Sequence, residues 1–479
     1  MTLKTSLLPH QQAAVDKLRR LKVGALYMEM GTGKTRTALE LIKLRLDAGK
    51  IDAVLWLCPC SVKGNLLADI RRHSDLAELP GLLTVCGIET LSTSVRANSE
   101  LRSLVSARRV CLIVDESSLV KNPNALRSRN ITRLAEKCGY KLILNGTPVT
   151  KFEADLYSQW AILDWRILGY RSFYSFAANH LEYDRDRPGR IVRALNVDYL
   201  ARKIEPYTFQ CRKDEVMKLP EKRTEEERFW MTEEQEDLYQ STLDTLLTDL
   251  DEMTDTSIYR LFGALQAIVS GFDLDIDGDL RVTRRPMFAD PEDNPRIRTL
   301  MDTVDRIPPE DKVLVFCTYT QEIHDVSACL EARWPGQTAE FYGAVPQRKR
   351  QARLDEFRES RRFLVANKAC AGYGLNLQFC HQVIYYSNDW DWATRIQSED
   401  RVYRLGQEQP VDIWDITASG TLDQKIMRCL TRKERLEEAI KRELGAANGQ
   451  REARGKFRAW LRGEMEDGIG KVVSGEKRV

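Results

Sequence analysis

The feature that most constrains the fold is a set of short apolar runs, each ending in polar residues. Each run is too short for a membrane span, and it fits a strand that is buried on both faces. Helical patterns separate the runs, and strands that alternate with helices indicate a parallel sheet covered on both sides. The runs are DAVLWLCP (52–59), VCLIVDES (110–117), KLILNGTP (141–148), KVLVFCTY (312–319), RFLVANKA (362–369), QVIYYSN (382–388) and VDIWDIT (411–417).

The runs fall into two blocks, so the expected fold class is α/β with two lobes, each built on a parallel sheet. Residues 11–46 are interpreted as helix, loop and helix, and residues 151–290 as mainly helical. A helix is expected at 421–445, and the remaining chain is polar. The predicted domains are a first lobe at 1–225 with a helical insertion from about 151, a linking region at 226–295, a second lobe at 296–445, and a tail at 446–479.

Composition excludes several classes of protein. With 479 residues, 43% hydrophobic and 30% charged, the chain is expected to be globular with two or three domains. It has no apolar run long enough to span a bilayer and no signal-peptide pattern, which favours a cytoplasmic protein with no membrane partner. Its eleven cysteines lack a paired CxxC spacing, so free thiols are expected and a structural metal is not. The net charge of +2 neither supports nor excludes nucleic acid.

The stretch ALYMEMGTGKT (25–35) ends as a phosphate-binding loop does. The general pattern asks for glycine at position 28, which is Met28 here, so this is either a chance match or a variant loop. Gly31 and Gly33 allow backbone amides to surround phosphates at a helix N-terminus. Lys34 can reach the outer phosphates and Thr35 can be a hydroxyl ligand of Mg²⁺, while Met28 is expected to pack beneath the loop.

Asp115 and Glu116 follow four apolar residues at the end of a predicted strand. Acids near a core are costly unless they have a partner or a role. Asp115 can hold Mg²⁺, and Glu116 can orient and deprotonate an attacking water. The alternative is a strand that merely ends at a helix cap. Together with the upstream loop, the pair predicts a nucleotide hydrolase.

The segment QSEDRVYRLGQ (397–407) supplies two arginines in the second block. Gln397, Arg401 and Arg404 are spaced by four and three residues, which predicts that they lie on one face of a helix. Such arginines can stabilise charge on the γ-phosphate if this block faces the first one. The alternative is a solvated basic helix face.

These residues resemble the motifs of the Swi/Snf group of helicase-type ATPases, in helicase superfamily two, over residues 7–430. QSEDRVYRLGQ is similar to motif VI almost letter for letter, and two linking segments, 219–239 and 420–426, also resemble Swi/Snf elements. The other similar segments are LLPHQ (7–11), EMGTGKT (29–35, motif I), LCPCSVKGNLLADI (57–70, motif Ia), DESSLVKNPNALRSRN (115–130, motif II), LNGTPVTK (144–151, motif III), LVFCTYT (314–320, motif IV) and the stretch 369–392 (motif V).

The resemblance implies two RecA-like lobes, with ATP as substrate and Mg²⁺ as cofactor. It implies catalytic roles for Lys34, Asp115, Glu116, Gln397, Arg401 and Arg404. The implied nucleotide-binding residues are Gln11, Met30, Gly31, Thr32, Gly33, Lys34, Thr35, Gly374, Arg401 and Arg404. The implied DNA-binding residues are Ser61, Lys63, Thr147, Thr318, Tyr319 and Lys368, and Thr147 would couple nucleotide to DNA.

The implied partner is DNA, double-stranded and bound without regard to sequence, together with a protein that is displaced or recruited. A monomer is expected, as a minimal bacterial or phage-encoded version in the bacterial or infected-host cytoplasm, or in the nucleus if the source is eukaryotic. Motif II has Ser117-Ser118 where the family usually has a small residue and then His, which leaves the link to motif III open.

Three functions remain open at this point. The first is a translocase that moves along duplex DNA and remodels or displaces bound protein. The second is a helicase that separates strands or remodels forks. The third is a nucleotide-dependent DNA-binding recruitment module, against which the complete set of hydrolytic residues argues.

Overall fold

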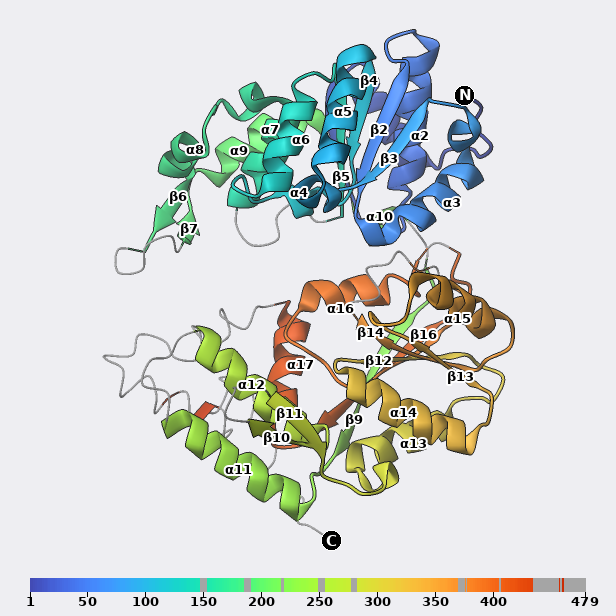
Figure 1. Ribbon diagram of the computed structural model, residues 1–479, viewed down its shortest axis with the longest axis vertical. Coiled ribbons are helices and arrows are strands. Elements are labelled where there is room, and N and C mark those ends of the chain that lie inside the picture. Colours follow the sequence, from blue (N-terminus) through green and yellow to red (C-terminus); the bar gives the residue numbers. More distant parts are fainter. Residues whose placement is uncertain are drawn as a thin grey trace. The chain divides into compact units, whose positions relative to one another are not determined.

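The computed structural model describes residues 1–146, 153–184, 191–216, 219–248, 255–276, 282–368, 375, 377–404, 406–433, 456 and 459–460. The chain forms two compact units, and the main division falls between Leu219 and Pro220, while Arg404 and Gly406 group with the first unit. Each unit is built on its own six-stranded sheet (Figure 1). The predicted α/β fold with two parallel-sheet lobes is confirmed.

Unit 1 carries a parallel sheet in the order β3-β2-β4-β5-β1-β8. Its strands are β1 (Val23–Met28), β2 (Ala53–Cys58), β3 (Leu83–Gly87), β4 (Val110–Val114), β5 (Tyr140–Asn145) and β8 (Thr208–Cys211). The helices around it are α1 (Pro9–Leu18), α2 (Lys34–Asp47), α3 (Lys63–His73), α4 (Thr90–Thr93), α5 (Val95–Ala107) and α6 (Leu126–Ala135).

The strands of unit 1 separate two hydrophobic cores. In β2, Leu55 and Leu57 belong to one buried cluster, whereas Val54 and Trp56 belong to the other. This alternation follows from the two-residue period of a strand. Helices on both faces are therefore required to cover the sheet.

A mainly helical segment, described from residue 153, lies between β5 and β8 in the chain. It contains α7 (Ala154–Leu168), α8 (Phe173–His180), the antiparallel pair β6 (Leu181–Tyr183) and β7 (Ile191–Ala194), and α9 (Val197–Ile204). Short α10 (Lys213–Val216) follows β8. Figure 1 shows α8, β6 and β7 at one side of the unit.

Unit 2 carries a second parallel sheet in the order β13-β14-β12-β15-β16-β9. Its strands are β9 (Lys222–Phe229), β12 (Val313–Cys317), β13 (Thr338–Phe341), β14 (Phe363–Asn367), β15 (Gln382–Tyr385) and β16 (Val411–Ala418). Its helices are α11 (Glu233–Thr248), α12 (Asp255–Val269), α13 (Pro295–Arg306), α14 (Thr320–Arg333), α15 (Gln347–Glu359), α16 (Trp392–Glu399) and α17 (Leu422–Arg432), and it has a hairpin of β10 (Phe272–Ile276) and β11 (Val282–Pro286).

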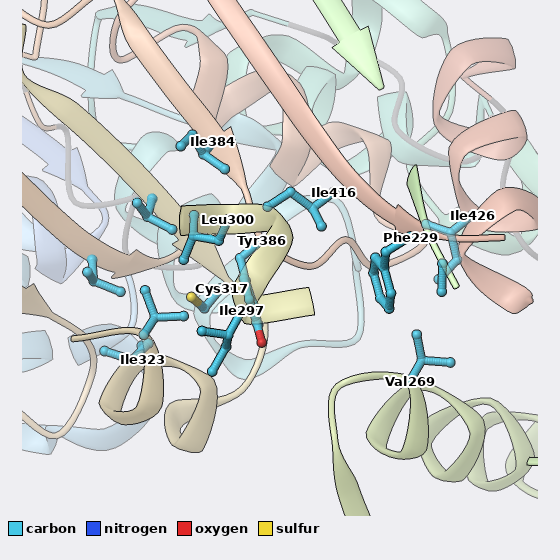
Figure 2. Close-up of a cluster of buried hydrophobic side chains, with 14 of the residues drawn as sticks. Phe229, Val269, Ile297, Leu300, Cys317, Ile323, Ile384, Tyr386, Ile416 and Ile426 are labelled. Atoms are coloured by element: carbon cyan, nitrogen blue, oxygen red, sulfur yellow. The ribbon is translucent and has the colours of Figure 1, made fainter. Parts of the chain in front are cut away.

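The helices α11 and α12 share the core of unit 2. Figure 2 shows Val269 of α12 and Phe229 of β9 in the same buried cluster as Ile297 and Ile323. The hydroxyl of Tyr239 on α11 accepts a hydrogen bond of 3.0 Å from the N–H of Leu422. The region expected to be a separate linker at 226–295 is therefore part of this unit's core.

The structure also differs from the sequence-based expectations at two other places. Residues 23–28 form β1, although 11–46 was interpreted as helix, loop and helix. The expected boundary after residue 225 falls inside β9, which pairs along its whole length with β16 of unit 2. The helix expected at 421–445 is present as α17 up to Arg432, and residues 434–445 lie outside the described residues.

Candidate functional site

The loop between β1 and α2 has the geometry of an anion-binding turn. Gly31 and Gly33 have φ angles of 83° and 90°, a region that favours glycine. The Nζ atom of Lys34, at the first position of α2, donates a hydrogen bond of 2.8 Å to the carbonyl oxygen of Met28. Met28 itself is buried in the core at the base of the loop, as expected. The amides at this helix N-terminus favour a bound anion.

Gln11 on α1 holds the same loop. Its Nε2 atom donates to the carbonyl oxygen of Thr32 over 3.1 Å, and its Oε1 atom accepts from the N–H of Leu8 over 3.0 Å. A Cβ atom on Gly33 would lie 2.1 Å from that Nε2 atom, so a larger residue there would displace the Gln11 side chain as well as adopt an unfavourable positive φ. His10 contacts the same Thr32 carbonyl at 2.8 Å. Gln11 therefore lies against the loop, and Thr32 is buried beneath it.

The two acids after β4 lie at the same sheet edge as the loop, because all strands of unit 1 run parallel. Burial, and next to it the charge of Glu116, raises the pKa of Asp115 to about 7, while the charge of Lys34 acts to lower it. Asp115 also accepts the N–H of Glu116 over 3.0 Å. Glu116 has a φ angle of 48°, which is uncommon for a residue with a side chain.

The donors near this edge fit a magnesium ion. The Thr35 hydroxyl and the Asp115 carboxylate are hard oxygen donors, and Mg²⁺ is usually held by one or two such groups together with substrate phosphates and water. Burial raises the pKa of Asp115, and a cation bound beside it would favour the ionised carboxylate. Within the described ranges, no group of three or more His, Cys, Asp or Glu side chains is placed to hold a metal ion.

The end of β2 adds residues to the same edge. Ser61 lies in a short 3₁₀ turn after β2, and Lys63 is exposed at the first position of α3. Asp69, one of the residues that the sequence did not single out, lies further along α3. Although burial acts to raise it, the pKa of Asp69 is lowered because His73 and the hydroxyl of Thr35 hydrogen-bond to the carboxylate. Asp69 thus contacts a residue predicted to bind the metal.

In unit 2, Thr318 and Tyr319 follow β12 and are fixed by a buried carboxylate. The backbone N–H groups of both residues donate to Oε2 of Glu322, over 2.9 and 3.0 Å. Ser387 donates to the same oxygen over 2.6 Å, and Arg296 lies 4.0 Å from Oε1. The Thr318 hydroxyl has no hydrogen-bond partner within the residues described. Glu322, which the sequence did not single out, therefore holds two predicted DNA-binding residues.

Lys368 lies at the end of β14 but is only 2% exposed. Its Nζ atom is 3.3 Å from Oδ1 of Asp389. Burial lowers the pKa of Lys368, and Asp389 opposes that effect. In this conformation the ammonium group is directed to a protein carboxylate and not to solvent.

The prediction that Gln397, Arg401 and Arg404 share one helix face is wrong. Helix α16 contains Gln397 but ends at Glu399, so Arg401 lies in a turn and Arg404 in the bend after it. The carbonyl oxygen of Arg401 accepts the N–H of Leu377 over 3.0 Å, which replaces the bond that a continuing helix would need. Arg401 is nevertheless buried, with 7% of its surface exposed.

Arg395, which the sequence did not single out, anchors α16 to the sheet. It makes a two-pronged ion pair with the fully buried Asp415 of β16, with N–O distances of 2.5 and 3.0 Å. Its guanidinium carbon lies 3.5 Å from the ring centroid of Tyr385 on β15. Charge-assisted pairs of this kind fix orientation as well as add energy. The helix that bears Gln397 is thus held in one position on unit 2.

Two predicted site residues, Thr147 and Gly374, lie outside the described residues. The cysteines Cys58, Cys111 and Cys211 are free and buried, as are most others in the described ranges. None of the helices in the described part of the chain combines the length and the hydropathy that a membrane crossing would require.

Two family profiles match this chain. That of the SNF2-related domain matches residues 83–269, and that of the helicase conserved C-terminal domain matches residues 295–406. The first match covers Asp115 and Glu116, and the second covers Thr318, Lys368, Gln397, Arg401 and Arg404. The two matches occur in the order that the motifs predict.

Individual proteins are similar at low identity. The putative ATP-dependent helicase/translocase YwqA of Bacillus subtilis is 26% identical over 412 residues, which are 83% of this chain and 41% of that protein. The DNA excision repair protein CSB of Oryza sativa is 24% identical over 332 residues, 66% of this chain and 27% of that protein. The chain therefore spans less than half the length of these relatives. A solved structure of the Sulfolobus solfataricus SWI2/SNF2 ATPase core in complex with dsDNA has 22% identity and a TM-score of 0.39, covering 92% of this chain and 93% of the other.

Proposed function

We propose that this chain, which is similar to the Swi/Snf-type group of helicase-like ATPases, hydrolyses ATP and uses the energy to move along double-stranded DNA. It does so without reading base sequence, and it displaces or remodels protein in its path. The relatives' names speak of ATP-dependent helicases and of a DNA repair protein, and the same chemistry is proposed for this chain.

The observation that carries the proposal is the meeting of three strand ends in unit 1. The loop after β1, the turn after β2 and the acids after β4 all lie at the carboxyl edge of one parallel sheet. Ligands of open α/β sheets bind at this edge. The charge of Lys34 acts to lower the pKa of Asp115, so the loop and the acids act on each other electrostatically.

The proposed roles follow from the chemistry of each side chain. Lys34 and the loop amides bind the outer phosphates of ATP, and Glu116 orients the attacking water and takes its proton. Thr35 and Asp115 would hold Mg²⁺, which supplies positive charge to the phosphate oxygens. Gln397, Arg401 and Arg404 stabilise negative charge that develops on the γ-phosphate.

DNA binding is assigned to groups that can contact phosphates. Lys63 is exposed beyond β2, and Thr318 and Tyr319 present a fixed loop beyond β12. Contacts of this type fix position on the duplex and carry no base information. Lys368 is left out of this assignment, because it is buried and paired with Asp389.

The deciding experiment measures ATP turnover with no DNA, with single-stranded DNA and with duplex DNA, beside triplex-displacement and strand-displacement assays. We expect duplex DNA to stimulate turnover and a third strand to be displaced without unwinding of the duplex. Strand separation would favour a helicase instead, and the absence of any stimulation by DNA would refute the motor.

The variant Glu116→Gln tests the assignment of the general base. Loss of a general base costs roughly 100-fold or more in turnover. We expect ATP to bind as tightly as in the parent chain while hydrolysis falls by at least that factor. A Glu116→Gln chain that hydrolyses ATP at the parental rate would remove Glu116 from the mechanism.

A further inference from the structure

A fully buried hydrogen bond ties the acid pair to the helical insertion of unit 1. Ser117, directly after Glu116, is 0% exposed, and its Oγ atom donates 2.6 Å to Oε1 of Gln159 on α7. Gln159 is also 0% exposed, and its Nε2 atom donates 2.8 Å to the carbonyl oxygen of Asp155. This second bond fixes the amide orientation, so Oε1 is the atom that faces the serine.

The same face of α7 makes a second contact with the acid segment, by which we mean residues 116–121. Asp155 lies one helical turn before Gln159, and its carboxylate is 3.9 Å from Nζ of Lys121. Between Ser117 and Lys121 the chain makes a single 3₁₀ turn, Ser117–Val120. The segment that begins at Glu116 is therefore attached to α7 at both of its ends.

Helix α7 also packs against the strand that leads into the phosphate loop. Trp160, next to Gln159, lies edge-on to Tyr27 of β1, with ring centroids 6.4 Å apart, and both side chains are buried. One turn of α7 thus contacts the end of β1 and the start of the acid segment. Any shift of this turn would move both sides of the proposed nucleotide site.

The position of Glu116 depends on such a restraint. Its φ and ψ angles are 48° and 54°, a left-handed conformation that residues with a side chain seldom adopt. A strained turn persists only where surrounding contacts determine it. Asp115 accepts the N–H of Glu116 itself, and the bond from Ser117 to Gln159 restrains the next residue from another element of the fold.

From this geometry we infer that Gln159 is a positioning residue for hydrolysis, which acts through Ser117 to hold the carboxylate of Glu116 where it can reach the attacking water. The inference rests on the proposed function. It gives Ser117, at one of the two unusual positions of motif II, a partner on α7 of the helical insertion. A misplacement of about 1 Å can cost roughly 100-fold in rate, so partial loosening of this turn should cost less but remain measurable.

The test is a double-mutant cycle of Ser117→Ala, Gln159→Met and the two combined. Each single variant leaves one buried polar group without its partner and is expected to be less stable. The combined variant replaces both groups by apolar ones, so its thermal unfolding midpoint should return towards that of the parent chain. Ser74→Ala is the matched control, because Ser74 is a 0% exposed serine of the same unit whose hydroxyl bonds the carbonyl oxygen of Ile70 and the N–H of Leu76.

The quantities to measure are turnover at saturating ATP and duplex DNA, the dissociation constant of ATP, and the unfolding midpoint. We expect turnover to fall about tenfold in both single variants and by about the same factor in the combined variant, since the two residues act as one unit. The ATP dissociation constant should change less than about twofold, and Ser74→Ala should keep parental turnover.

A combined variant with parental turnover would overturn the inference, since the bond would then serve packing alone. A tenfold loss that appears equally in Ser74→Ala would also overturn it. If the parent chain shows no ATP turnover with any DNA, the proposed function itself fails, and that result is distinguishable because it does not depend on the variants.

Discussion

At the scale of single residues, Asp115 is the group whose chemistry depends most on its surroundings. Burial and the neighbouring Glu116 raise its pKa from an ordinary 3.8 to about 7. A carboxylate that is half protonated near neutral pH is ready to ionise when a cation approaches.

This raised pKa predicts a pH-dependent loss of stability. The folded state retains a proton up to about pH 7, whereas the unfolded state loses it near 3.8, so stability falls as the pH rises between these values and then levels off. Asp115→Asn mimics the neutral form and should escape the loss. Both chains are unfolded with urea in EDTA, from about pH 5 to about pH 8. The free energy of unfolding of the variant, relative to that of the parent chain, should rise by at most about 1.4 kcal/mol for each pH unit. A difference that is independent of pH would contradict the raised pKa.

The residues that could be predicted are those whose role follows from local sequence. The motif spacing pointed to Lys34, Asp115 and Glu116, because a strand end beside a helix start is visible in a few adjacent letters. Gln159 and Arg395 could not be found that way. Their partners lie 42 and 20 residues away, and only the folded sheet brings them together.

At the scale of elements, the edge strand β13 shows how the sheet of unit 2 avoids pairing with another chain. The outward N–H of Thr338 donates to Glu331, and its carbonyl oxygen accepts from the guanidinium of Arg361. The carbonyl oxygen of Glu340 accepts from Arg353 over 2.9 Å. Side chains therefore occupy backbone groups that an unprotected edge would offer to another strand.

Removal of the arginine side chains that bond the outer carbonyl groups of β13 should promote self-association. The pair Arg353→Ala and Arg361→Ala frees two carbonyl groups of β13, and we expect concentration-dependent oligomers in sedimentation velocity and light scattering. The control pair Arg333→Ala and Arg358→Ala removes the same charge without touching β13, since Arg333 bonds Asp305 and Arg358 lies over Phe379. Equal association of both pairs would attribute the effect to lost charge and not to the exposed edge.

Edge position also explains which strands the sequence revealed. Every predicted run became an interior strand of one of the sheets. The strands β3, β8, β9 and β13, which were not predicted, are the four outer ones. An outer strand is less enclosed and needs no continuous apolar run, as the charged sequence KRTEEERF of β9 illustrates. The interior strand β1 was missed for another reason, because its glycine, alanine and methionine have weak strand preference.

At the scale of the whole molecule, the two units have separate hydrophobic cores. The clusters around the first sheet contain only residues of unit 1, and the cluster in Figure 2 contains only residues of unit 2. The boundary between the two units could not be predicted from composition, because the sequence of β9 is polar and is typical of a linker. Its membership of unit 2 becomes visible only through its pairing with β16.

Separate cores predict two unfolding transitions in calorimetry. Leu112→Ala in β4 and Leu300→Ala in α13 each remove a fully buried side chain, at a cost of about 2–5 kcal/mol. We expect each variant to lower one transition and to leave the other near its parental temperature. A single transition that both variants lower equally would mean that the units unfold together.

The pairing of β9 with β16 has a consequence for biosynthesis. The first strand of unit 2, at Lys222–Phe229, lies beside the last strand, at Val411–Ala418, and the rest of the sheet lies between them in the chain. A ribosome that releases the chain from its N-terminus delivers β9 long before its partner exists. The unit therefore cannot close its sheet until synthesis is nearly complete. The charged residues of β9 keep the unpaired strand soluble during synthesis. The same residues that make β9 hard to predict as a strand therefore also protect it against premature pairing.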